Sequence, residues 1–251
     1  MTGVAMTASK PIYDRIGLDY SHLRKPDPRI ARLIHDALGD SPTVLNVGAG
    51  TGNYEPTDRD VTALEPSAEM IAQRALGAAP VVQGRAEALP FADDSFDAAM
   101  AVLTVHHWTD QPKGLAEMRR VARSRVAILT FDPDYRESWL YDYLPELAEL
   151  DAVIMPPLGD YEESLGPVEI TPVPIHHDCT DGFLASYWKR PEAYLDPQIR
   201  QGISSFWKIG GVEPGLARLA SYIETGEWKR RYGHLLELDA IDTGYRLVTT
   251  L

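Results

Sequence analysis

Three glycines at alternate positions, Gly48, Gly50 and Gly52, follow a short apolar run that begins at Val44. Glycine lets the backbone take positive φ and carries no Cβ that would hold a ligand away from the chain. A turn of this kind, at the carboxyl end of a buried strand, is where open α/β sheets bind nucleotides. These residues therefore favour close approach of the backbone to a nucleotide-like ligand.

The spacing around these glycines indicates the class of nucleotide. It is G-x-G-x-G with Asn53 next, so the dinucleotide fingerprint G-x-G-x-x-G is not met. The polar segment 53–60 contains Pro56 and leaves little room for a crossover helix, which argues against a pyrophosphate on a helix N-terminus. Glu65 ends the next apolar run, where nucleotide folds place the carboxylate that accepts both ribose hydroxyls. We therefore expect an adenosine without phosphates.

A polar cluster that begins with His106 and His107 and ends at Asp110 follows a longer apolar run. If that run is the next strand of the sheet, the cluster lies at the same edge as the glycine turn. An imidazole titrates near neutral pH, so one of the two histidines can serve as a general base. The alternative, which we favour, is that both orient the loop by hydrogen bonding. Of the two, His106 is expected to face inward.

Several other chemistries find no support in the sequence. No G-x-S-x-G elbow is present, and Cys179 is the only cysteine, so a serine hydrolase and a thiolate zinc cluster are not expected. The neighbouring pair His176 and His177 would point to opposite faces of a strand, which disfavours a chelate, and no metal site is predicted. The net charge of −13 disfavours nucleic acid and acidic membranes as partners.

The start of the chain, 1–10, lacks the apolar core of a secretory signal, and no apolar run has membrane-spanning length. We therefore expect no membrane association and a cytoplasmic location. For the oligomeric state we expect either a monomer or a homodimer.

Alternating helical and strand patterns are expected to position the site in a doubly wound, mostly parallel α/β sheet. Two helices come first, at 13–23 and 28–38. Later helices are expected from the cap Ser67 to about Leu76 and over 111–121. The expected strands of this half are 44–47, 61–64, 80–83, 96–103 and 125–130.

The second half has a looser pattern. It predicts a helix over 137–150, a Pro/Gly-rich loop over 151–163, a strand over 168–175, a helical and aromatic-rich stretch over 181–226, and a last strand over 244–249. The strand over 168–175 contains two prolines, so it cannot be ladder-bonded along its full length on both sides.

Four segments of the first half stand in a recognisable order: VLNVGAGTG, LEPS, GRAEALPFADDSFDAAM and LTVHHWTD. Together they resemble class I S-adenosylmethionine (SAM)-dependent methyltransferases, in the small-molecule branch with a methyltransferase type 11-like domain. The resemblance is strong over 13–132. It implies a Rossmann-like seven-stranded sheet in one methyltransferase domain over 1–251. The implied parts are an N-terminal helical lid over 11–38, a SAM-binding core over 43–132, and a C-terminal half over 133–251 with a helical cap about 181–226.

The resemblance also implies a set of cofactor contacts. They are Tyr13, Tyr20, Arg24, Gly48, Ala49, Gly50, Gly52, Glu65, Pro66, Met70, Arg85, Ala86, Glu87, Ala101 and Val102. Two positions depart from the family pattern. Many relatives carry Asp where this chain has Arg85, and Asn46 replaces a frequent acid before the first glycine.

The implied function is transfer of the SAM methyl group to a small-molecule acceptor by in-line displacement, with S-adenosylhomocysteine as product. The catalytic candidates are His106, His107 and Tyr20, and the acceptor-site candidates are His106, His176, Tyr187, Trp188 and Phe206. Two alternatives remain open at this point. They are a SAM-using enzyme with another outcome, such as cyclisation or intramolecular displacement, and a non-catalytic SAM-binding module.

Overall fold

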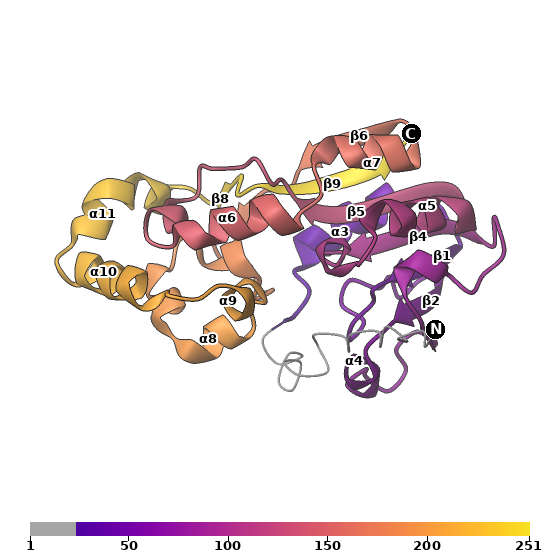
Figure 1. The fold of residues 1–251 in the computed structure, drawn as a ribbon, viewed down its shortest axis with the longest axis horizontal. Coiled ribbons are helices and arrows are strands. Elements are labelled where there is room, and N and C mark those ends of the chain that lie inside the picture. The colour runs from indigo at the N-terminus through magenta and orange to yellow at the C-terminus, as the bar shows by residue number, and fades with distance from the viewer. Residues whose placement is uncertain (1–23) are drawn as a thin grey trace, which may run out of the picture.

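The computed structural model describes residues 24–251, so the predicted helix over 13–23 lies outside the described residues. A seven-stranded sheet forms one half of the molecule, and a group of helices forms the other (Figure 1). In sequence order the strands of the sheet are β1 (Thr43–Val47), β2 (Asp60–Glu65), β3 (Val81–Gln83), β4 (Phe96–Val102), β5 (Ala122–Phe131), β6 (Val168–Pro172) and β9 (Tyr245–Thr250).

The strand order is β3-β2-β1-β4-β5-β9-β6. Strands β1 to β5 pair in parallel, and β9 runs antiparallel between β5 and β6. The predicted mostly parallel, seven-stranded sheet is confirmed. Because the direction of strand succession reverses between β1 and β4, the carboxyl ends of these two strands form the switch point at which such sheets bind ligands.

Helices cover both faces of this sheet. On one face α3 (Pro28–Ala37) buries Ile30 and Ile34, and its N-cap is Asp27. On the other face α5 (Gln111–Val121) packs beside α7 (Leu158–Leu165), which buries Tyr161 against the same cluster. The buried sheet between these layers holds the strand ends in fixed positions.

Short turns connect the strands near the switch point. Ser67 caps α4 (Ala68–Ala72), which ends four residues before the predicted end at Leu76. Two single 3-10 turns, η1 (Ala86–Ala88) and η2 (Val105–His107), follow β3 and β4. No helix lies between β1 and β2, as expected from segment 53–60.

The second half departs from the prediction in several places. The predicted helix over 137–150 is divided into a short 3-10 turn at 139–142 and a helix that begins at Pro145. The predicted loop over 151–163 is wrong, because α6 (Pro145–Ile154) and then α7 occupy it. Tyr161 and Leu165 bury against the sheet, and this packing outweighs the helix-weakening effect of Gly159. The predicted strand over 168–175 is divided, since β6 ends at Pro172 and β7 (Ile175–His176) pairs with β8 (Ala240–Ile241) in a separate ladder.

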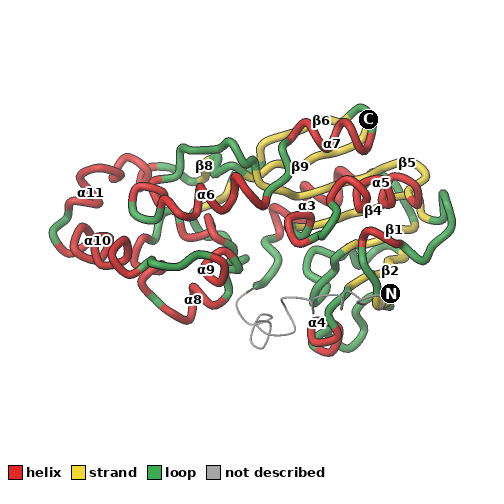
Figure 2. Tube along the Cα trace, viewed as in Figure 1, coloured by secondary structure: helices red, strands yellow, loops and turns green. Residues whose placement is uncertain are grey.

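The remaining helices form a cap (left in Figure 1 and red in Figure 2). It begins with η3 (Trp139–Asp142) and α6, and continues with η4 (Leu184–Tyr187), η5 (Pro191–Leu195), α8 (Pro197–Gln201), α9 (Ser205–Lys208), α10 (Glu213–Glu224), α11 (Glu227–Tyr232) and η6 (Gly233–Glu237). The helical part thus continues past Gly226. Trp139 is at its centre, with ring centroids 5.6 Å from Tyr194 and 5.3 Å from Trp228.

Among the helices of residues 24–251, none combines the length and apolar character needed to cross a membrane.

Candidate functional site

A cavity of about 340 Å³ opens at the carboxyl ends of β1, β2 and β4, where the strand order reverses. The cap closes part of it through Lys208, the last residue of α9. The residues that line the cavity are Arg24, Asn46, Gly48, Ala49, Gly50, Thr51, Asn53, Tyr54, Leu64, Glu65, Pro66, Met70, Arg85, Ala86, Glu87, Val102, Leu103, Thr104, His106, His107, Trp108, Thr109 and Lys208.

The glycine turn leaves the backbone open to this cavity. Gly48 and Gly50 have φ of +71° and +53°, a region that residues with a side chain rarely adopt. A Cβ at Gly48 would lie 2.2 Å from Thr104 Oγ1, so no larger residue fits there without displacing β4's end. Glycine is therefore required for steric reasons at position 48, where the chain leaves β1 beside the cavity.

Glu65 at the end of β2 is a buried carboxylate, with 5% of the residue exposed. The backbone N–H of Gly50 donates to its Oε2 at 2.8 Å, and the backbone N–H of Ser67 donates to its Oε1 at 2.8 Å. These two backbone donors orient the Glu65 carboxylate at the cavity wall.

A buried ion pair supports the glycine turn from behind. Arg74 Nη2 lies 2.8 Å from Glu55 Oε2, and Arg74 Nη1 donates to the carbonyl of Gly50 at 3.2 Å. Asn46 Nδ2 donates to Glu55 Oε1 at 3.1 Å. An acid at position 46 would face Glu55 with like charge, which explains why this chain has an amide there.

The two histidines of η2 both border the cavity, so His107 reaches it as well as His106, which was expected to face inward. Their ring centroids are 3.9 Å apart. Burial, with smaller effects of the positive Lys208 and Arg24, lowers the pKa of His106 to about 3. Burial also lowers the pKa of His107 well below its usual value. Both imidazoles are therefore neutral at pH 7 and can each offer one donor and one acceptor.

Glu87 fixes the loop that carries these histidines. Its Oε1 accepts from the backbone N–H and the hydroxyl of Thr109, both at 2.7 Å, and from the backbone N–H of Asp110 at 3.3 Å. These hydrogen bonds lower the pKa of Glu87 despite the opposing effect of burial.

Just before the loop, Leu103 adopts φ of +50°, a strained conformation of the kind that clusters at functional sites.

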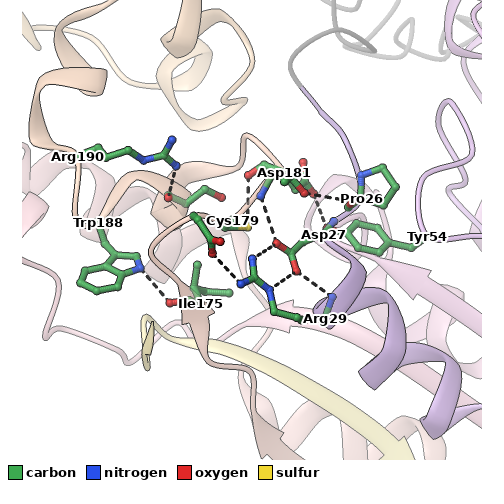
Figure 3. A network of polar contacts seen from close by, with 12 residues as sticks. Pro26, Asp27, Arg29, Tyr54, Ile175, Cys179, Asp181, Trp188 and Arg190 are labelled. Carbon is green, nitrogen blue, oxygen red and sulfur yellow. Dashed lines mark hydrogen bonds and ion pairs between the residues drawn. The ribbon is translucent and has the colours of Figure 1, made fainter. Parts of the chain in front are cut away.

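A buried polar network joins the cavity wall to the start of the cap (Figure 3). Arg24, which lines the cavity, has its Nε 2.5 Å from Asp181 Oδ1. Tyr54 donates its hydroxyl to Asp181 Oδ2 at 2.8 Å. Burial and the nearby carboxylate raise the pKa of Tyr54, so the hydroxyl stays a donor. Asp27 accepts from the backbone N–H groups of Arg29 and Thr180, which ties α3 to the same segment.

Comparison with known proteins decides the family. Residues 45–130 match the family model described as a methyltransferase domain. The chain is 37% identical to a putative methyltransferase from an antibiotic biosynthesis pathway of Anabaena variabilis, over 91% of this chain and 99% of that chain, with a TM-score of 0.84. The chain belongs to the class I SAM-dependent methyltransferase family. The resemblance found in the four motifs is thereby confirmed.

Other relatives of this methyltransferase-family chain match a smaller part of it. A demethylmenaquinone methyltransferase of Renibacterium salmoninarum is 40% identical over 38% of this chain and 44% of its own length. A malonyl-[acyl-carrier protein] O-methyltransferase of Erwinia pyrifoliae is 38% identical over 39% of each chain. The chain thus spans less than half the length of these two curated relatives.

Most of the residues predicted to contact the cofactor lie together in the cavity of this methyltransferase fold. They are Arg24, Gly48, Ala49, Gly50, Glu65, Pro66, Met70, Arg85, Ala86, Glu87 and Val102. Gly52 and Ala101 are not part of its lining, and Ala101 is fully buried in β4. Tyr13 and Tyr20 lie outside the described residues.

Of the predicted acceptor residues, only His106 reaches the cavity. Trp188 is buried and donates its Nε1 to the carbonyl of Ile175 at 2.9 Å, which is a packing role. Tyr187 and Phe206 pack against the aromatic cluster of the cap, and His176 lies in the ladder formed by β7 and β8. The structure does not bring these four residues to the cavity.

Several residues that line the cavity were not predicted as site residues, among them Thr104, Tyr54 and Lys208. Thr104 lies two residues after the end of β4, so its place at the carboxyl end of a strand could have indicated it, as it did for His106. Tyr54 lies in the segment after the glycines, where its φ of +66° is not foreseeable from its type. Lys208 is 101 positions from His107, and only the packing of α9 brings them together. No local pattern could have indicated that contact.

No group of three or more His, Cys, Asp or Glu side chains that could hold a metal ion occurs within residues 24–251. Burial raises the pKa of the Cys179 thiol to about 11, which makes this cysteine a poor nucleophile.

Proposed function

We propose that this protein binds SAM in the cavity at the switch point and transfers its methyl group to a small-molecule acceptor by in-line displacement. The observation that carries the proposal is the joint placement of the glycine turn, the buried Glu65 and the two histidines around one cavity. The chain's membership of the methyltransferase family supports the same conclusion.

The cavity fits an adenosyl group without phosphates. Glu65 lines the cavity as a buried carboxylate, a group that can accept from ribose hydroxyls, and its negative charge would repel a phosphate at that point. Gly48 and Gly50 line the cavity without a side chain that would exclude the methionine part. Met70 packs beneath Gly50, and Arg85 with Ala86 borders the far side, where the adenine would lie.

SAM, when bound, supplies a methyl group on a sulfonium that is already a good leaving group. The chain then has to place the acceptor in line with that methyl group, and such placement can contribute about 7–11 kcal/mol to lowering the barrier. A His106 with a pKa of about 3 is a weak base at pH 7. We therefore assign His106 and His107 to orienting the acceptor by hydrogen bonds, with proton removal as a lesser role.

The test is an activity assay with SAM labelled in the transferred methyl group and a broad set of small acceptors. We expect labelled methylated product together with S-adenosylhomocysteine, and loss of both in Glu65→Ala but not in the exposed control Glu163→Ala. Consumption of SAM with no acceptor would indicate cyclisation or intramolecular displacement. Tight binding of SAM without turnover across the set would indicate a binding module. Either result would overturn the proposal.

A further inference from the structure

Lys208 is the one side chain of α9 that lines the cavity, and its position suggests what the acceptor carries. Its Nζ lies 3.4 Å from His107 Nδ1, on the side of the cavity formed by the histidine loop rather than by the glycine turn. Burial lowers its pKa, as expected for an ammonium that faces an enclosed space.

The two cations at this end of the cavity differ in how they are neutralised. Arg24 pairs with the fully buried carboxylate of Asp181. Among the ion pairs of residues 24–251, none involves Lys208. Asp151, which is not part of the cavity lining, raises the pKa of Lys208 through its negative charge. Asp151 is buried, accepts from the hydroxyl of Tyr141 at 3.1 Å, and has its pKa raised to about 6.

The positive charge of the half-buried Lys208 ammonium is not neutralised by the two imidazoles beside it, because both are neutral. A partly desolvated cation gains most from an anion that enters the same space. His107 and His106 cannot supply that charge, because burial keeps both of them neutral. A sulfonium in the same cavity adds a second positive charge, so an anion between it and Lys208 would be attracted by both.

We propose that Lys208, together with His107, forms an anion site for the acceptor, and that the acceptor carries an acidic oxygen group such as a carboxylate or an ionised phenol. Lys208 is then a specificity-determining residue supplied by the cap. This inference rests on the proposed function, because it assumes that the cofactor occupies the glycine side of the cavity. The methionine carboxylate of the cofactor is the other possible source of an anion, and the test separates the two.

The experiment measures binding of matched acids and amides to protein saturated with S-adenosylhomocysteine. The probe pairs are benzoate and benzamide, 4-hydroxybenzoate and 4-hydroxybenzamide, and octanoate and octanamide. We expect at least one acid to bind about 10-fold or more tightly than its amide. This preference should vanish in Lys208→Met, which keeps the length of the side chain, and persist in Lys229→Met, which removes an exposed lysine of the cap.

The outcomes distinguish this inference from the proposed function. Unchanged affinity for S-adenosylhomocysteine in Lys208→Met, with loss of the preference for acids, supports the acceptor anion site. A fall of about 10-fold in that affinity would assign Lys208 to the cofactor carboxylate and overturn the inference alone. Absence of acid preference in every pair, or its persistence in Lys208→Met, would also overturn it. No binding of S-adenosylhomocysteine to the wild type would overturn the proposed function itself.

Discussion

The two ends of the cavity are built in different ways. At the end near β1 and β2, the cavity is lined by the glycine turn and by Glu65, a buried carboxylate. At the end near the cap, the surface is made of side chains from distant parts of the chain, namely Arg24, His107 and Lys208. One end is fixed by strand order and glycine geometry. The other is fixed by contacts between residues that lie more than one hundred positions apart in the sequence.

This difference suggests how one fold serves many acceptors. The backbone at the glycine-turn end cannot vary much, because its hydrogen bonds and positive φ values fix the turn. The side chains at the cap end can be exchanged without disturbing the sheet. We therefore expect substitutions at the first end to affect binding of the cofactor and those at the second to affect stability of the cap or choice of acceptor.

The largest effect is expected from breaking the network at the cap end. Asp181→Ala leaves the buried Arg24 guanidinium without its carboxylate and Tyr54 without its acceptor. Removal of one partner of a buried pair costs about 3–5 kcal/mol, so the free energy of unfolding should fall by about that amount.

Chemical denaturation measures this change. The control is Asp178→Ala, an exposed partner of Arg29, whose loss should cost no more than about 1 kcal/mol. Equal losses in the two variants would show that the Asp181 network does not hold the cap in place.

The next effect concerns the glycine turn. Gly48→Ala places a Cβ 2.2 Å from Thr104 Oγ1 at a φ of +71°, so affinity for S-adenosylhomocysteine should fall by about 100-fold or more. Gly77→Ala is the matched control, since Gly77 has φ of +86° but faces open space. It should lower stability by about 1–2 kcal/mol and leave affinity unchanged. Similar affinities in both variants would rule out a direct role of the turn in binding.

A smaller effect is expected from Glu65→Gln. The amide keeps the shape of the side chain but removes its charge and turns one acceptor into a donor that faces an N–H of the turn. Hydrogen bonds to a charged group contribute about 1.5–3 kcal/mol, so affinity for S-adenosylhomocysteine should fall by about 10- to 100-fold by calorimetry. Glu163→Gln, on the surface of α7, should bind like the wild type. Wild-type affinity in Glu65→Gln would contradict the ribose contact.

The smallest effect is expected from pH. Because the pKa of His106 is lowered to about 3, its imidazole remains neutral from pH 8 down to about pH 4, and its NMR signals should not titrate in that interval. His234, in η6 of the cap and outside the cavity, is the reference histidine. A titration of His106 with a midpoint near 6.5 would make it a better general base than the structure indicates.

The sequence predicted the residues at the glycine-turn end of the cavity well and those at the cap end poorly, for a physical reason. The glycine turn, Glu65 and the histidine loop are local signals, since each follows a strand and the carboxyl ends of parallel strands meet at one edge. Lys208 and Asp181 have no such signal, because their roles depend on how short helices pack. The aromatic residues Trp188 and Phe206 were expected at the acceptor but pack in or against the buried core.

The boundaries of the elements show the same contrast. Helix α5 begins and ends where it was predicted, at Gln111 and Val121, with an Asp110 cap and a Pro in its first turn. Helix α7 was missed, since Gly159 weakens its local signal and the burial of Tyr161 stabilises it instead. Local propensity is sufficient in the first case, and tertiary contacts decide the second.

The most direct test of the central claim is calorimetric titration of the wild-type protein with S-adenosylhomocysteine, and separately with ADP and NAD. The claim is that the cavity between the glycine turn and Glu65 holds an adenosyl group without phosphates. It predicts binding of one S-adenosylhomocysteine per chain in the micromolar range and much weaker binding of both phosphorylated ligands. No measurable heat with S-adenosylhomocysteine, or tighter binding of NAD, would contradict it.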